Sequence, residues 1–279
     1  MSNRNNMDRM GSQTIHADAP KSSILDFVSP TEFVELPSKG LGYSDDHPLC
    51  GVDVIEIRFM TAKDEDILTS ETLLRKGIAL ERLLENIIID KSIDPKTMLI
   101  GDRNAIIIAA RASGYGNIYE TKVNCPNCGS GASMSFDLSK PKIQEIDIES
   151  TEIFSKNDKG NYIIKLPQTN FDVEVRLLTG KDEHYLTQLA QSKKKNKLGD
   201  SAMTDQYKMM IRSVDGVEDR SILDKFVEVM PASDSRFLRK AYKALIPNIK
   251  ISEDFSCNSC GHEQELEVSF GADFFWPDS

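Results

Sequence analysis

The stretches "IEIRFMTAKDEDILT" (Ile55–Thr69) and "VEVRLLTGKDEHYLT" (Val173–Thr187) repeat one pattern within the chain. Aligned without a gap, they share eight of fifteen residues, where unrelated sequences would share about one. Most of the other positions exchange one apolar residue for another. Leu36-Pro37 stands before the first stretch and Leu166-Pro167 before the second. The comparison predicts that the chain is a tandem duplication.

Each stretch predicts a strand that runs into a helix. Apolar and charged residues alternate at "IEIR" and "VEVR", as in a half-buried strand. Thr61 and Thr179 precede Asp64 and Asp182 by three positions, a spacing that predicts a capped helix start. In the first copy we expect one helix that buries seven apolar residues: Leu73, Leu74, Ile78, Leu83, Leu84, Ile87 and Ile88. A further capped helix is expected to start at Asp102.

Four of the five cysteines form two C-x-x-C-G motifs, Cys125–Gly129 and Cys257–Gly261. Asp102 lies 23 residues before the first motif and Asp234 lies 23 residues before the second, so the motifs occupy equivalent places in the two copies. Each motif stands between two strand-like stretches, which predicts a zinc knuckle at the turn of a hairpin. A zinc-ribbon-like site holds one structural Zn²⁺ with four thiolates. We expect each copy to supply two of them, giving the ligand set Cys125, Cys128, Cys257 and Cys260.

Other interpretations of the cysteines stay open. Cys128 and Cys257 are separated by 128 residues, whereas ribbons usually leave roughly 15 to 20 between the two pairs. The thiols could be reduced structural side chains, or each pair could meet a second pair only in a dimer. A dithiol redox motif is a further alternative, although neither motif opens a helix after a strand. His262 could replace a thiolate, but a neighbouring surface histidine is the simpler interpretation.

The predicted fold class is α+β, a pseudo-twofold tandem duplication of a strand–helices–zinc-knuckle hairpin unit. Its expected organisation, in chain order, is a flexible N-terminal arm (1–29), repeat 1 (30–140), a linker (141–159), repeat 2 (160–271) and an aromatic C-terminal tail (272–279).

The composition argues against several classes of function. The formal net charge of −10 is a poor match to the phosphate backbone, so no nucleic-acid binding is expected. "KKKNK" (Lys193–Lys197) is most simply a solvated loop between helices. No run approaches the roughly 18 apolar residues of a membrane span, so no membrane insertion is expected. The motifs of P-loops, zinc proteases and serine hydrolases are absent from the sequence, and we expect no enzyme activity.

Two segments have no counterpart in the other copy. The first is the glycine-rich insertion 38–51, which contains Tyr43. The second is the tail, with Phe274, Phe275 and the only tryptophan, Trp276. Terminal aromatic residues either seal a core or anchor in another protein, and aromatic anchors dominate interface energies. These four residues are the candidate partner-binding side chains.

Several stretches together resemble the baseplate hub proteins of contractile-tailed bacteriophages. They are "FVELPSKGLGY", "IEIRFMTAKDEDILTS", "MLIGDRNAIIIAARASGYG" (Met98–Gly116), "YETKVNCPNCG" and "DFFWP". The resemblance implies a virion or assembly protein that contacts other hub and wedge proteins in the tail baseplate, assembled in the host cytoplasm. It leaves open whether the chain is a hub subunit or an assembly chaperone absent from the finished particle. It supplies no catalytic residues.

The expected function is therefore a structural or assembly component of a phage contractile-tail baseplate, in the hub region, that bridges other proteins through a zinc-stapled scaffold. A zinc-ribbon protein that binds nucleic acid is the alternative from another class. The mixed-to-acidic residues beside the cysteine motifs argue against it.

Overall fold

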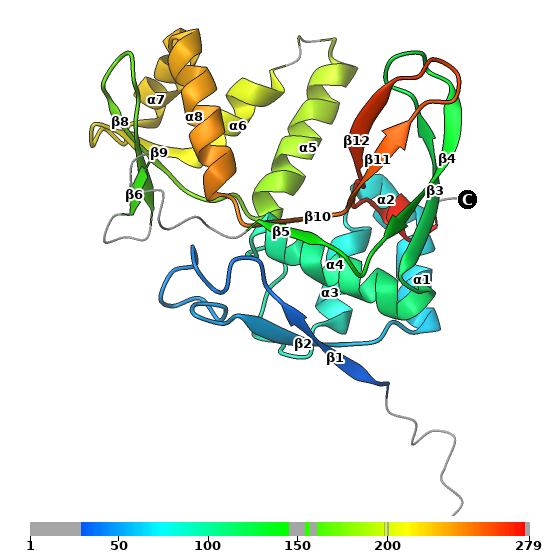
Figure 1. Ribbon diagram of the computed structural model, residues 1–279. Coiled ribbons are helices and arrows are strands. Elements are labelled where there is room, and N and C mark those ends of the chain that lie inside the picture. The colour runs from blue at the N-terminus through cyan, green and yellow to red at the C-terminus, as the bar shows by residue number, and fades with distance from the viewer. Residues whose placement is uncertain (1–28, 145–153, 157–160, 198, 200, 277–279) are drawn as a thin grey trace, which may run out of the picture.

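The computed structural model describes residues 29–144, 154–156, 161–197, 199 and 201–276. All of the predicted arm except Ser29 lies outside these residues, as do residues 277–279 of the predicted tail. The structure is an α+β fold of helices and small antiparallel sheets (Figure 1). Residues 29–144 are called the first half below and residues 154–276 the second half.

The first half contains, in chain order, β1 (Thr31–Glu35), β2 (Val54–Arg58), α1 (Ala62–Thr69), α2 (Glu71–Lys76), α3 (Ala79–Ile87), α4 (Ile100–Tyr115), β3 (Ile118–Asn124), β4 (Gly131–Asp137) and β5 (Lys142–Gln144). The second half contains β6 (Phe154–Lys156), β7 (Tyr162–Lys165), β8 (Asp172–Val175), α5 (Gly180–Lys195), α6 (Ala202–Met210), β9 (Ile211–Val214), α7 (Arg220–Val229), α8 (Ala232–Leu245), β10 (Asn248–Lys250), β11 (Ser252–Ser256), β12 (Glu263–Glu267) and the 3₁₀ turn Ala272–Phe274. Strands β5 and β6 fall inside the predicted linker, residues 141–159.

The repeated stretches form the same strand arrangement in both halves. β2 pairs with β1 so that Ile57 lies opposite Glu32, and Ile57 also bridges to Ile88 on its other side. At the equivalent place in β8, Val175 lies opposite Tyr162 of β7 and Ile211 of β9. Alternation explains the burial: Ile55 and Ile57 of β2 and Val173 and Val175 of β8 are buried, while the glutamate between each pair is partly exposed.

A buried aspartate at each helix start ties the strand to the helix. Asp64 accepts hydrogen bonds from the backbone N–H and the hydroxyl of Thr61, each 2.8 Å long. Each carboxylate oxygen of Asp64 also accepts a hydrogen bond from one terminal nitrogen of Arg58, at 2.7 and 3.0 Å. The second half repeats the arrangement with Thr179, Asp182 and Arg176. The capped start predicted from the spacing is therefore present in both halves, and a bidentate arginine accompanies it.

A second pair of buried aspartates holds the loops that follow the Leu-Pro dipeptides. Asp102 accepts hydrogen bonds from the backbone N–H of Ser38 at 2.9 Å and from its hydroxyl at 2.6 Å. Asp234 accepts from the backbone N–H groups of Gln168 and Thr169, at 2.8 and 3.0 Å. Helix α4 begins at Ile100 without a side-chain cap, so the prediction that Asp102 caps it is wrong. The carboxylate instead fixes a loop that is distant in sequence.

The single long helix expected in the first half is three short ones. Gly77, with a φ of 68°, ends α2 in the left-handed region. Helix α2 buries none of its residues, and Leu74 is 42 % exposed. The expected burial holds for α3, where Leu83, Leu84 and Ile87 are in the core. The spacing of Leu73 and Leu74 continues that stripe and predicts their burial, but the turn at Gly77 rotates them away from the core.

One hydrophobic core extends through both halves. Helix α4 runs beside β10, and a Cβ on Gly101 would lie 2.0 Å from the carbonyl oxygen of Pro247. Strand β5 pairs with β10, and Arg103 of α4 contacts Glu183 of α5 at 2.9 Å. Figure 1 shows α4 beneath β10 and beside the foot of α5. The two halves are therefore joined along α4 as well as at their hairpins.

We expect Arg58→Ala to lower the free energy of unfolding by on the order of 3 kcal/mol, because it leaves the fully buried Asp64 carboxylate without its cation. Arg75→Ala is the control. Its ion pair with Glu71 is exposed at both ends, and its loss should cost less than about 0.5 kcal/mol. Urea denaturation of both variants measures the difference. Equal effects would contradict the role given to the buried pair.

Acid should weaken the same anchor. Burial acts to raise the pKa of Asp64, but the hydrogen bonds from Arg58 and Thr61 outweigh it and hold the pKa at about 2, below the ordinary 3.8. A lowered carboxyl pKa stabilises the folded chain above pH 3.8, and that contribution is lost as the pH falls towards 2. The stability advantage of the wild type over Asp64→Asn, measured by urea denaturation, should shrink over this interval. Asp66→Asn is the control, because it removes an exposed carboxylate of the same helix and leaves the Arg58–Asp64 pair in place.

Candidate metal centre

Two hairpins present the cysteines at their turns. β3 pairs with β4 from Ile118 opposite Asp137 to Asn124 opposite Gly131, and β11 pairs with β12 from Ser252 opposite Glu267 to Ser256 opposite Glu263. Figure 1 shows the two hairpins side by side, with their turns at the same end. The strand–turn–strand arrangement predicted for both cysteine motifs is therefore present.

The two turns have the same backbone geometry. Gly129 donates to the carbonyl of Cys125 and Gly261 donates to the carbonyl of Cys257, both at 2.8 Å. The two glycines have φ values of 74° and 68°, a region that favours glycine because it has no Cβ. The turn that follows each second cysteine thus needs the glycine that the sequence supplies.

The turns bring the four thiols together. The sulfur atoms of Cys125, Cys128, Cys257 and Cys260 all lie within 4.8 Å of one another. Two separations between the motifs are 3.8 Å, from Cys125 to Cys260, and 3.7 Å, from Cys128 to Cys257. Four sulfurs bound tetrahedrally at about 2.3 Å from a zinc ion would be about 3.8 Å apart. The donor set and its dimensions therefore fit a tetrahedral thiolate site for a metal ion.

Sulfur atoms of different hairpins contact each other across the cluster. An oxidised redox C-x-x-C motif would instead join the two sulfurs of one motif at the disulfide distance of about 2.05 Å. All five cysteines are free thiols, and Cys50 is exposed and outside the cluster. The arrangement therefore links the first half to the second.

Two polar side chains that the sequence analysis did not single out contact the sulfurs. The hydroxyl of Ser130 lies 3.1 Å from the sulfur of Cys128 and 3.3 Å from that of Cys257. The amide of Asn127 lies 3.6 Å from the sulfur of Cys260. Both residues are inside or directly after the first motif, and that position is the signal that could have identified them. Such donors relieve the negative charge of metal-bound thiolates.

The thiols differ in acidity. The hydrogen bond from Ser130 lowers the pKa of Cys128, and it is the main cause that lowers the pKa of Cys257 to about 6. The amide of Asn127 and the backbone N–H of His262 act to lower the pKa of Cys260, but desolvation together with the neighbouring thiols Cys128 and Cys257 raises that pKa to about 11. Crowded thiols resist full ionisation because each new thiolate repels the others. A bound cation removes this obstacle.

A small apolar cluster supports the site from within the hairpins. Cys125 and Cys257 are buried together with Phe255, and Val123 and Leu266 pack against them. His262 is not among the clustered ligands. Its side chain contacts Gln264 at 3.0 Å, and its backbone carbonyl accepts from the N–H of Cys257.

The candidate partner-binding side chains lie mostly inside the chain. Phe274 and Phe275 are buried against Tyr115, Tyr119 and other aromatic residues of the core, so they seal this chain's own core and are not exposed to a partner. Tyr43 is also buried: its hydroxyl donates to Asp102 at 2.7 Å and accepts from the N–H of Leu99 at 2.9 Å. Trp276 is half-buried.

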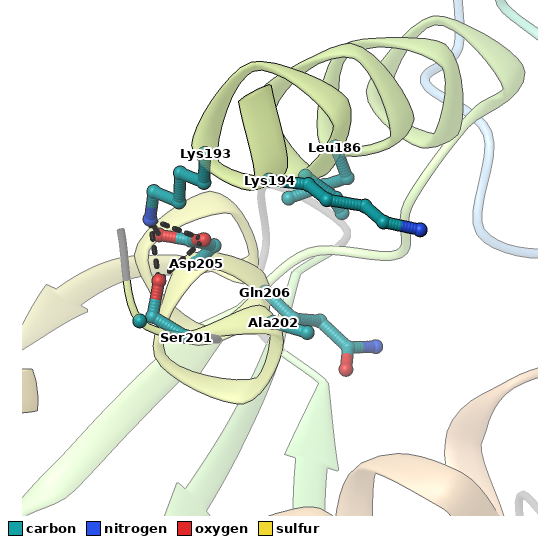
Figure 2. A pocket seen from close by; sticks show the side chains of 9 residues that line it. Leu186, Lys193, Lys194, Ser201, Ala202, Asp205 and Gln206 are labelled. Atoms are coloured by element: carbon teal, nitrogen blue, oxygen red, sulfur yellow. Dashed lines mark hydrogen bonds and ion pairs between the residues drawn. The ribbon is translucent and has the colours of Figure 1, made fainter. Parts of the chain in front are cut away.

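A separate pocket of about 500 Å³ lies between α5 and α6 (Figure 2). Lys193 reaches across it to Asp205 at 2.6 Å, so the two charged groups neutralise each other and connect the helices. The expectation of a loop at "KKKNK" is wrong for Lys193–Lys195, which form the last turn of α5. Lysines suit this position because the C-terminal end of a helix is negative.

No helix in the described part of the chain has both the length and the apolar character needed to cross a bilayer. No curated protein matches the chain, and no solved structure matches it. A family model described as "T4 bacteriophage base plate protein" matches residues 30–276, which include all four clustered cysteines and both hairpins. The chain therefore belongs to the T4 bacteriophage base plate protein family and is a phage baseplate protein.

Proposed function

We propose that the chain is a non-enzymatic structural component of the hub region of a contractile-tail baseplate, where it bridges hub and wedge proteins through a zinc-stapled scaffold. The family match over residues 30–276 supports a structural role in the baseplate, a place in the virion tail and other baseplate proteins as partners. The observation that carries the finer proposal is the four-thiol cluster. It joins two hairpins that are far apart in sequence.

Zinc is the metal that this donor set favours. Soft thiolate ligands in a tetrahedron suit zinc, and a site with four protein ligands is closed to substrates. The proposed role of the ion is therefore mechanical: it holds the turns of two hairpins in one orientation. Cys125, Cys128, Cys257 and Cys260 would be its ligands.

The scaffold arose, in this proposal, by tandem duplication of one unit. Support comes from equivalent contacts in the two halves: the Arg58–Asp64 and Arg176–Asp182 pairs, and the hairpin turns with matching backbone hydrogen bonds. A duplicated unit presents two similar but unequal faces, which suits a protein that contacts neighbours of different kinds.

Two alternatives have different consequences. An assembly chaperone would use the same scaffold but leave before the particle is finished. A nucleic-acid-binding zinc ribbon would need a basic surface beside the metal. Strand β12 instead presents three exposed glutamates, Glu263, Glu265 and Glu267, and Lys142 and Lys250 are paired with two of them. This acidic surface favours a protein partner.

Native mass spectrometry of the purified chain should find one zinc per monomer, removed by a strong chelator. Cys257→Ser should lose the ion, whereas Cys50→Ser, which alters the thiol outside the cluster, should keep it. Because the halves also share a core, chelation should speed hydrogen exchange in the β3–β4 and β11–β12 hairpins and leave α4 protected. A chain without metal, or zinc found only in a dimer that shares its sites, would contradict the intramolecular staple.

Quantitative mass spectrometry of purified virions should detect this chain at a fixed ratio to the other baseplate proteins, because a structural component stays in the particle. Particles that form with its help but do not contain it would favour the chaperone alternative. Assembly intermediates from infected cells, taken from the host cytoplasm, provide the control in which both a component and a chaperone are present.

A further inference from the structure

Strand β1 has an edge that no described strand covers. β1 pairs with β2, where Phe59 donates to the carbonyl of Pro30 and Leu36 donates to that of Asp53, both at 2.8 Å. Antiparallel strands bond at alternate residues, so the even-numbered residues of β1 use their backbone groups toward β2. The backbone N–H and C=O groups of Thr31, Phe33 and Glu35 therefore point to the opposite side.

In the second half, a strand pairs with the equivalent edge. β7 corresponds to β1, with Ile163 at the place of Phe33 and Leu166 at the place of Leu36. Leu166 donates to the carbonyl of Phe171 at 2.9 Å, so Ile163 likewise points its backbone groups away from β8. There β6 pairs with them, with Ser155 opposite Ile163. Among the described residues, the first half has no strand in the position that β6 takes in the second.

Two side chains of β1 lack the contacts that a covering strand would supply. Phe33 is 74 % exposed, whereas Ile163, its counterpart beneath β6, is half-buried. One carboxylate oxygen of Glu32 is shielded from solvent and has no hydrogen-bond partner among the described residues. A shielded oxygen without a donor is unfavourable. The edge therefore lacks both backbone partners and a positively charged or polar donor.

We propose that the open edge of β1 accepts an extended strand from a neighbouring baseplate protein, in the position that β6 fills in the second half. The incoming strand would carry a basic residue for Glu32 and an apolar residue against Phe33. Strand addition uses backbone hydrogen bonds for affinity and alternate side chains for specificity. An exposed edge also invites aggregation unless a partner covers it.

Charge favours a partner over the chain's own preceding residues. Residues 24–26 stand as far before Phe33 as β6 stands before Ile163, and they include Asp26 but no basic residue. The edge already carries Glu32 and Glu35, and Glu56 lies opposite Phe33. Another carboxylate would add repulsion, whereas a basic strand would relieve it. The inference rests on the proposed structural role, because it needs a baseplate neighbour, but it does not depend on the metal.

Hydrogen exchange of the full chain tests the proposal with two probe peptides. One is a short blocked peptide of alternating lysine and valine, and the matched control replaces lysine with glutamate. The lysine peptide should slow exchange at the amides of Thr31, Phe33 and Glu35 by about tenfold or more, because strand addition protects them. The glutamate peptide should leave them unchanged. No slowing, or equal slowing by both peptides, would overturn the proposal.

Exchange without a peptide identifies the other occupants. If the same three amides are already slow, the edge is covered: slowing that depends on protein concentration means a second copy, and slowing that does not means another part of the same chain. Either result would overturn the partner strand.

Phe33→Lys should abolish the protection by the lysine peptide, because a lysine at an edge strand repels a basic strand and removes the apolar contact. Val229→Lys is the matched control, since Val229 is 77 % exposed on α7 and should leave the protection intact. Zinc content and the urea midpoint of both variants are read in the same samples. If the wild-type chain holds zinc but the lysine peptide does not protect its three amides, the strand-acceptor proposal alone is wrong. If the wild-type chain holds no zinc, the result counts against the stapled scaffold.

Discussion

Buried carboxylates are the constraint on which both halves depend. Asp64, Asp102, Asp182 and Asp234 are all shielded from water, and a buried charge is tolerated only when donors surround it. Each therefore demands a fixed set of neighbours. Asp64 and Asp182 fix the passage from strand to helix, while Asp102 and Asp234 fix the loops after the Leu-Pro dipeptides. Strand, loop and helix cannot move independently around such groups, so the hairpins that follow start from a defined position.

The relative orientation of the halves is determined in two places. Along α4 it follows from close packing, since Gly101 leaves no room for a side chain beside Pro247. At the hairpin turns the halves also meet, where the four thiols converge. The packing contacts lie in a shared core, whereas the turns pack against the small cluster around Phe255. A metal ion at the turns would therefore rigidify a region outside the shared core.

Repetition made much of this structure predictable from the sequence. The similarity of Ile55–Thr69 to Val173–Thr187 predicts the strand before Thr61 and the pairing of distant cysteines, since equivalent motifs in similar units can meet. What failed depended on contacts between residues far apart. Asp102 looks like a helix cap because Ser38, its actual partner, is 64 positions away. Leu74 failed for a local reason instead, since the turn at Gly77 interrupts the helical stripe that it follows. The burial of Phe274 could not be predicted, because it depends on which part of the core surface the other elements leave uncovered.

The burial of that aromatic tail affects synthesis of the chain. Phe274 packs against Tyr119, and its carbonyl accepts a hydrogen bond from Arg111, which lies 163 positions earlier. While a ribosome is still making the second half, the surface around Tyr119 and Phe136 has no cover. A chain that stops before Phe274 therefore leaves this aromatic surface open to water, and an uncovered aromatic surface of this kind is what quality-control chaperones and proteases act on.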